Sequence, residues 1–186
     1  MVFNFRIVSD EVDNFRREIN IDSSATFLDL RNAICDAVGY SKNEMCSFFL
    51  CDENWEKEKE ITLEDMGSDS SEDVWLMDES ILSDFIEDEG QHLLFVFDYM
   101  TDRAFFIKMK EIMPKKTLKD PVCTISMGTP PPQIMDIEEF DIKNDAKNAS
   151  MLSSSDMDED FYGSAEYNDD EFDAEGFDEM TFDDKY

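Results

Sequence analysis

The most regular apolar pattern in the chain runs from Leu93 to Met109 and predicts two strands joined by a tight turn. Residues 93–97 are all apolar, so the first strand is covered on both faces and belongs in the middle of a sheet. The polar residues 101–103 supply the reversal. In the second strand Phe105, Ile107 and Met109 share one face, as in a half-buried partner strand. We expect the rest of the domain to be arranged around this hairpin.

The start of the chain predicts a second hairpin. Residues 2–8 alternate between apolar and polar side chains, as in a strand with one wet face. After the polar residues 9–14, residues 15–21 bring the chain back as the second strand. Arg16 and Arg17 point to opposite faces of that strand, so we interpret them as solvated or salt-bridged side chains rather than as an anion site.

The clearest helix signal follows at residues 26–39. Thr26 and Asp29, three residues apart, have the form of a capping box with Asp in place of the usual Glu. Apolar residues then recur at the helical period, and Gly39 suits the left-handed position after the last turn. The apolar stripe of this helix is expected to lie across the sheet.

Four weaker signals complete the predicted domain. They are a strand at 45–51, a long surface loop with one short ordered piece at 52–73, a short helix at 81–86 that ends near Gly90, and an edge strand at 121–128. Three prolines at 130–132 then stop regular structure. We therefore place the folded domain at residues 1–133 and a separate tail at residues 134–186.

Charge sets the tail apart. The chain carries 16 basic and 47 acidic residues, a net charge of −31. From Ile134 onward there are 3 basic and 19 acidic residues. An acidic surplus of this size repels phosphate backbones and anionic lipid, so direct binding to nucleic acid or to a membrane surface is disfavoured. An unknown protein partner, basic in character, is compatible with this charge.

The tail contains aromatic residues about every five positions but almost no aliphatic ones. It cannot bury enough apolar area to offset its ordering entropy, so we expect it to be disordered. Aromatic side chains kept soluble by acidic neighbours remain available to a partner's groove. A solubilising tail without a specific target is an equally weighted alternative. The partner-binding candidates are Phe161, Tyr162, Tyr167, Phe172, Phe177, Phe182 and Tyr186.

The four cysteines and the single histidine offer little metal chemistry. Their spacing contains no CxxC pair, which disfavours a structural zinc site. The cysteines lie in apolar patterns, as reduced thiols of a cytosolic protein do. No apolar run has the length of a signal peptide or a membrane span. We expect a cytoplasmic monomer without a metal or another cofactor.

Catalytic motifs are sparse as well. The sequence contains no GxGxxG, GxxxxGK or HExxH pattern. Nucleophilic catalysis needs a base beside Ser or Cys, and the one imidazole is His92. Its pairing with Cys35, Cys46 or Cys123 stays open. The sequence thus leans away from an enzyme without deciding the matter.

Four short stretches, taken together and in this order along the chain, resemble the motifs of a known protein family. They are residues 26–30 running to Ala37-Val-Gly-Tyr40, Ile81-Leu-Ser-Asp-Phe85, Phe95-Val-Phe-Asp-Tyr99 with Asp102, and Pro121-Val-Cys123 followed by Gly128 and two prolines at 131–132. In this set the chain resembles the plasmid pRiA4b ORF-3-like family, small prokaryotic proteins also carried by mobile elements. The third stretch corresponds to the family's Tyr-x-Tyr-Asp-Phe-Gly-Asp-x-Trp hairpin. The resemblance covers most of residues 1–133.

The resemblance implies an α+β domain with a β-grasp-like mixed sheet and helices packed on one face. It brings no established activity, because the family is largely uncharacterised, and a fold alone confers none. The family usually has His at the position of Arg31, a His-Leu pair near Glu44, and Gly and Trp at Thr101 and Phe105. The residues that keep or replace the family's polar positions are Arg31, Asp98, Asp102 and Arg103, which we take as a candidate polar site.

Three functions follow from these observations. The first is a non-catalytic protein-interaction module whose acidic tail engages a basic or groove-bearing partner. The second is a mimic of nucleic-acid charge that occupies the basic surface of a DNA-binding or mobile-element protein. The third is a weak metal-dependent hydrolase around Asp98 and Asp102. A turn role for these two carboxylates, capping backbone amides in the hairpin, is favoured over catalysis.

Overall fold

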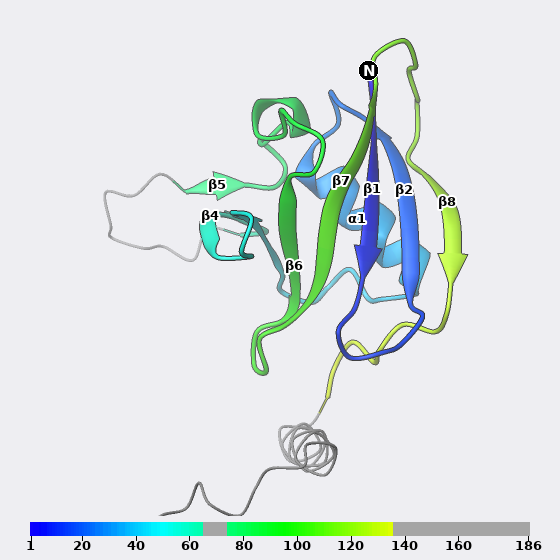
Figure 1. Cartoon of the computed structure of the whole chain (residues 1–186). Coiled ribbons are helices and arrows are strands. Elements are labelled where there is room, and N and C mark those ends of the chain that lie inside the picture. The colour runs from blue at the N-terminus through cyan, green and yellow to red at the C-terminus, as the bar shows by residue number, and fades with distance from the viewer. Residues whose placement is uncertain (65–73, 136–186) are drawn as a thin grey trace, which may run out of the picture. The chain divides into compact units, whose positions relative to one another are not determined.

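A computed structural model of the chain describes residues 1–64 and 74–135, and these form one eight-stranded sheet with a single α-helix (Figure 1). The strand order is β5-β4-β3-β6-β7-β1-β2-β8. The β4–β5 pair is parallel and the other pairs are antiparallel, so the expected α+β class with a mixed sheet is confirmed. The elements are β1 (Val2–Val8), β2 (Arg16–Asp22), α1 (Phe27–Val38), β3 (Ser47–Cys51), β4 (Lys57–Thr62), β5 (Trp75–Leu76), η1 (Leu82–Asp84), β6 (His92–Asp98), β7 (Arg103–Met113) and β8 (Val122–Met127).

The hairpin of β6 and β7 lies in the middle of the sheet, as its apolar pattern predicts. β6 pairs with β3 on one side and with β7 on the other, and β7 pairs in turn with β1. Both faces of β6 are buried: Phe95 on one face and Val96 on the other are each 1% exposed. A strand that is covered on both faces and paired on both edges anchors the whole sheet.

Helix α1 covers one face of the sheet, behind β1 and β2 in Figure 1. Its predicted capping box is present, because the Asp29 amide donates to Thr26 Oγ1 at 3.2 Å and the Thr26 amide donates to Asp29 Oδ2 at 3.0 Å. Gly39 ends the helix with φ of 75°. Phe27, Leu30 and Ile34 are fully buried against the sheet. The predicted position of the helix across the sheet is therefore confirmed.

The helix predicted at residues 81–86 is wrong. This segment forms only a single 3₁₀ turn, Leu82–Asp84, preceded by a bridge between Ile81 and Thr26. Leu82 and Ile86 are buried as predicted. In a run of only six residues, a single 3₁₀ turn is enough to bury these apolar side chains, so no α-helix is needed. In the described residues, the helices expected on one face thus reduce to α1 alone.

Two of the weaker strand predictions agree with the structure. The short ordered piece expected within residues 52–73 is β4, whose first four residues are exposed and therefore show no apolar alternation. The edge strand predicted at 121–128 is β8, which pairs with β2.

The described residues up to Met135 belong to one compact unit. The predicted disordered tail and its seven aromatic candidates lie outside the described residues, except for the first two positions of the tail, Ile134 and Met135. The domain boundary at Gln133 stays a prediction.

Candidate functional site

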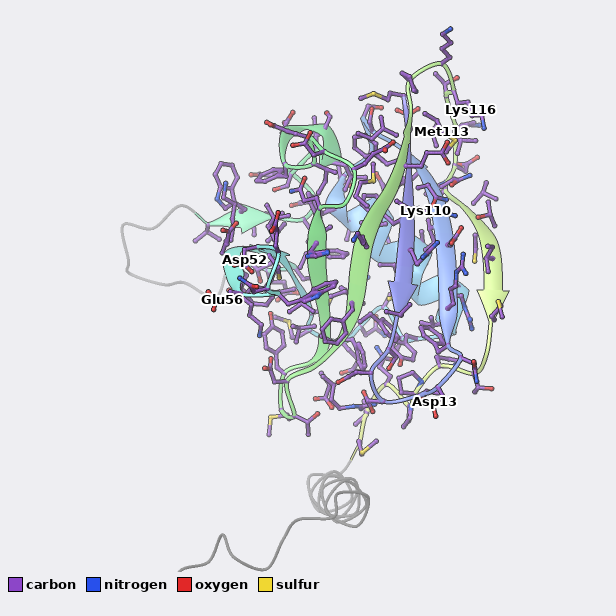
Figure 2. All side chains as sticks on the ribbon, in the orientation of Figure 1. Asp13, Asp52, Glu56, Lys110, Met113 and Lys116 are labelled. Atoms are coloured by element: carbon purple, nitrogen blue, oxygen red, sulfur yellow. The ribbon has the colours of Figure 1, made fainter. Side chains whose placement is uncertain are left out.

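The sheet face opposite α1 carries most of the polar side chains of the central strands. In the register of the sheet, Arg6 lies beside Glu18 on one side and Lys108 on the other. Figure 2 shows Lys110 on the same side of the sheet, facing away from the helix. Within residues 1–64 and 74–135 no helix covers this face.

Glu18 organises the basic residues of this face. Lys110 donates to its carboxylate at 2.9 Å, Arg6 Nε donates at 3.2 Å, and Arg16 forms a further ion pair with it. Burial alone would raise the pKa of Glu18, but these hydrogen bonds outweigh burial and hold the pKa below its ordinary value. Glu18 is therefore ionised at neutral pH, and its charge is satisfied within the protein.

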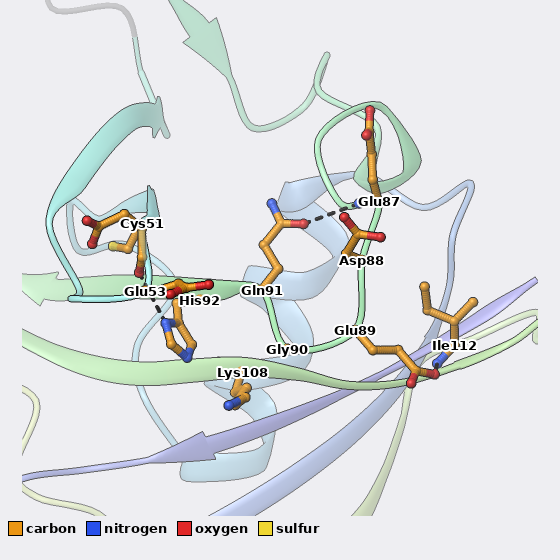
Figure 3. A pocket seen from close by; sticks show the side chains of 11 residues that line it. Cys51, Glu53, Glu87, Asp88, Glu89, Gly90, Gln91, His92, Lys108 and Ile112 are labelled. Carbon is orange, nitrogen blue, oxygen red and sulfur yellow. Dashed lines mark hydrogen bonds between the residues drawn. The ribbon is translucent and has the colours of Figure 1, made fainter.

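A pocket of about 1040 Å³ opens where β3, β6 and the loop before β6 meet. We call it the His92 pocket (Figure 3). Its walls hold five carboxylate side chains but only one lysine and one histidine. The lining residues are Cys51, Asp52, Glu53, Glu87, Asp88, Glu89, Gly90, Gln91, His92, Lys108 and Ile112.

The loop over residues 87–91 is fixed by its own polar side chains. Gln91 donates to the Phe85 carbonyl at 2.8 Å and accepts from the Glu87 amide at 3.2 Å. Glu89 accepts from the Ile112 amide at 2.8 Å, which attaches the loop to β7. Gly90 has φ of 94°, a conformation that side chains rarely adopt. Glu89 and Gln91 thus shape the wall of the pocket.

The opposite wall is a turn that begins at Asp52. Its carboxylate accepts from the amides of Asn54 and Glu56, both at 2.8 Å, and the Glu56 amide is the main reason why the pKa of Asp52 is lowered. The turn places Trp55 on the His92 ring, with the two centroids 4.2 Å apart and the planes 11° from parallel. His92 Nδ1 lies 3.1 Å from the Asp52 carbonyl. The imidazole is therefore held by stacking and by a backbone contact.

His92 faces a cysteine that the sequence did not single out. Cys51 on β3 is its partner across the sheet, whereas Cys35, Cys46 and Cys123 do not line the pocket. Burial raises the pKa of the Cys51 thiol, which keeps it protonated at neutral pH. The thiolate is the form in which cysteine acts as a nucleophile. The lining of the pocket is mainly acidic.

The thiols should differ in reactivity in the order of their burial. Burial raises the pKa of Cys35 to about 11 and also raises the pKa of Cys46 and Cys51, while Cys123 is exposed. At about pH 8 we expect iodoacetamide to label Cys123 at least about tenfold faster than the other three, because burial limits access to those three thiols and raises their pKa values. Mass spectrometry of timed digests measures the rates. Labelling of Cys51 as fast as that of Cys123 would contradict a buried, protonated thiol.

Two of the four predicted polar-site residues meet at one place. Arg103 is 3% exposed, and its guanidinium donates to Glu11 at 2.9 and 3.0 Å and lies 3.5 Å from Asp98. It also donates to the carbonyl of Pro132 at 2.6 Å. Arg103 thereby fastens residues 130–133, which we call the proline segment, to the end of the central hairpin.

Asp98, besides lying near Arg103, caps the hairpin by accepting from the Met100 amide at 3.1 Å and the Thr101 hydroxyl at 2.7 Å, which is the turn role that the sequence favours.

The other two predicted residues, Asp102 and Arg31, lie apart from Arg103 and Asp98. Asp102 is on the surface, where Lys57 donates to it at 3.0 Å. Arg31 is buried on α1 and donates to the Lys42 carbonyl in the following loop. Each contact has a structural role, and in residues 1–64 and 74–135 no group of three or more His, Cys, Asp and Glu side chains is arranged to hold a metal ion.

The interpretation of Arg17 as solvated or salt-bridged is wrong. Arg17 is 4% exposed and donates to the carbonyls of Ala37 and Gly128 at 3.0 and 3.1 Å, joining β2 to α1 and to the end of β8. Period two puts Arg17 on the same face as Ile19 and Ile21, and this alternation was a usable signal of burial. The His92 pocket was also missed, although the acidic run just before His92 pointed to it.

The comparisons with known proteins agree with the fold. A model of the family described as plasmid pRiA4b ORF-3-like protein matches residues 2–181 of the chain. A crystal structure of a protein of unknown function from Methanosarcina mazei Go1 is similar, with a TM-score of 0.58 and 17% sequence identity. The similarity covers 85% of this chain and 84% of that protein, and at this identity it bears on the fold alone. No curated protein matches the chain. Among the described helices, none is long and apolar enough to span a bilayer.

Proposed function

The chain belongs to the plasmid pRiA4b ORF-3-like protein family, and we propose that it is a non-catalytic module that binds a basic protein partner. The observation that carries this proposal is the charge of the His92 pocket. Five carboxylates line it against one lysine and one histidine. A Lys or Arg side chain of a partner brings the complementary charge, and the stack of Trp55 on His92 keeps that wall of the pocket rigid.

The acidic tail supplies a second contact in this proposal. Residues 134–186 hold 19 of the 47 acidic residues but only 3 basic ones, and the family match runs through most of them. Their aromatic residues, Phe161 to Tyr186, would dock on the same partner. We place the module in the cytoplasm, in keeping with its four free cysteines. A β-grasp-like description of the fold belongs to the same proposal and is supported by the opening hairpin and the helix that follows it.

The proposal is tested by neutralising the pocket in the full chain. In one variant Glu53→Gln, Glu87→Gln and Asp88→Asn are combined. A matched control combines Asp10→Asn, Asp13→Asn and Asp78→Asn, three exposed carboxylates that do not line the pocket. Calorimetric titration with octalysine and octaarginine measures binding at low and at physiological salt. We expect the pocket variant to bind about tenfold more weakly than the control, because each lost charge contact weakens binding severalfold.

The same pair of variants separates the proposal from its main alternative. A mimic of nucleic-acid charge depends on the summed charge of the chain, so it would lose affinity equally in the two variants and more steeply with salt. Equal losses would overturn the assignment to the pocket. A third variant, with the seven tail aromatics replaced by Ser, keeps every charge. If this variant binds the peptides as tightly as the unmodified chain does, the tail aromatics do not contribute and the tail is removed from the proposal.

A further inference from the structure

Besides the His92 pocket, the outer edge of β8 is a second surface that is suited to binding a partner. β8 pairs with β2 on one side and ends the strand order of the sheet, at the right in Figure 1. Among the described residues no strand pairs with its other side. An edge strand presents a row of backbone N–H and C=O groups that can pair with another chain.

This edge lacks the usual protection by charge. A third of the residues in the chain are charged, yet none lies between Pro121 and Met135. Val122 and Met127 are 46% and 52% exposed, and Thr and Ile at 124 and 125 favour extended backbone. The register shift opposite Glu18 and Ile19 interrupts the edge once, and Ile125 to Met127 form a regular run after it. Natural edges are commonly guarded by Lys or Pro, and within β8 neither occurs.

The C-terminal end of β8 is also held in place by contacts with Arg17 and Asn14. Arg17 donates to the carbonyls of Met127 and Gly128, at the end of the strand. Gly128 has φ of 68°, and a Cβ there would lie 2.7 Å from the Asn14 carbonyl oxygen, so the chain is packed tightly as it leaves β8. A strand that is fixed in its extended form costs less entropy to pair than one that must first be ordered.

A groove beside the edge sets the chemistry of what can bind there. It measures about 430 Å³ and runs between α1 and β8, with Asp29, Asp36, Asp120 and Cys123 among its lining residues. Lys42 pairs with Asp36 at 2.6 Å and offsets one of the three negative charges. On the other face of β8, the register places Ile125 and Met127 beside Glu18 and Arg16. An added strand would therefore meet carboxylates on the helix side and apolar side chains on the open side.

From this arrangement we propose that β8 accepts, by strand addition, an extended segment of a basic protein in which basic and apolar residues alternate. The basic residues would enter the groove and the apolar residues would lie beside Ile125 and Met127. A second copy of this chain fits poorly, because its β8 has no basic residue and two chains of net charge −31 repel. The surface is separate from the His92 pocket, since β7, β1 and β2 lie between β6 and β8.

The test uses a defined peptide and the full chain. The probe is the acetylated, fluorescently labelled heptapeptide Lys-Val-Lys-Val-Lys-Val-Lys, and anisotropy reports its binding. A version with Glu in place of Lys should bind at least about tenfold more weakly. Two further versions carry N-methyl groups on either the valines or the lysines. Alternate residues of a strand direct their N–H groups to opposite edges, so one version should lose binding and the other keep it. Equal binding of these two versions would overturn strand addition.

Variants of the protein locate the site. Cys123→Lys places a cation in the groove and should weaken binding of the lysine peptide about tenfold, whereas Cys123→Ser, its matched control, should leave binding unchanged. Cys123 is exposed, so neither change disturbs the core. If the variant with the neutralised His92 pocket no longer binds the peptide and Cys123→Lys still binds it, then the peptide binds in the pocket and the proposal for the edge of β8 fails. The pocket proposal would survive that result, so the two failures are distinguishable.

Discussion

Replacement of Arg103 by Met is expected to lower the free energy of unfolding by about 3–5 kcal/mol, because it removes one partner of a buried ion pair. Arg103 is 3% exposed and holds Glu11 through two hydrogen bonds. Its loss leaves the Glu11 carboxylate without its cation and the carbonyls of Pro132 and Gln133 without a donor. Urea denaturation of the full chain, followed by tryptophan fluorescence and circular dichroism, measures the change.

Lys57→Met is the matched control for this experiment. It also removes a cation from a carboxylate of the central hairpin, but the side chains of Lys57 and Asp102 are 37% and 73% exposed. Solvent screens such a pair, so we expect a loss below about 1 kcal/mol. The double variant Arg103→Met with Glu11→Gln should recover part of the stability, since it no longer buries an unpaired charge. A similar loss for Arg103→Met and Lys57→Met would refute the role of Arg103 as the buried anchor of the proline segment.

Phe105→Ala should cost about 3–5 kcal/mol, the range for an aromatic ring removed from a packed core. Phe105 is fully buried, and its ring lies 4.7 Å from Phe97, 5.2 Å from Phe15 and 5.7 Å from Tyr40. These neighbours come from β6, from the loop just before β2 and from the loop after α1, so no single element can relax to fill the cavity. Urea titrations monitored by far-UV circular dichroism give the free energy of unfolding.

The next residue along β7 provides the comparison. Phe106 has the same side chain but points to the open face, where it is only partly buried against Trp55 at 5.0 Å. Phe106→Ala should cost about 1 kcal/mol, because less apolar area is lost and water can fill the space. Equal losses at the two positions would mean that Phe106 is packed as tightly as Phe105.

Local signals in the sequence were sufficient for the elements that depend on neighbours in the chain. The central hairpin follows from period two, and α1 follows from the Thr26–Asp29 box and Gly39, which act within one helical turn. The segment at 81–86 failed because six residues with an apolar face do not distinguish a 3₁₀ turn from a helix. The strand β4 has four exposed residues at its start, so its position depends on pairing with β3 and leaves no apolar pattern to read.

The candidate sites depend on contacts between distant segments, which a single sequence does not specify. Arg17 meets Gly128, 111 residues away, and Arg103 meets Glu11, 92 residues away. The His92 pocket joins two loops that come together only through the pairing of β3 with β6. Asp98 could be assigned to its turn because its partners lie two and three residues ahead. Arg31 gave no comparable signal, since its carbonyl partner lies in the loop beyond the helix.

The place of β1 in the sheet has a consequence for synthesis on the ribosome. Val2–Val8 is made before its second neighbour in the sheet, Arg103–Met113, which follows about a hundred residues later. Until β7 has been made, the β1–β2 hairpin can bury its apolar face against α1 only in part, with one edge still unpaired. Completion of the sheet must await nearly the whole domain. This domain should therefore fold as a unit only once β7 has been made, and slowly for its size, because the pairing of β1 with β7 is non-local.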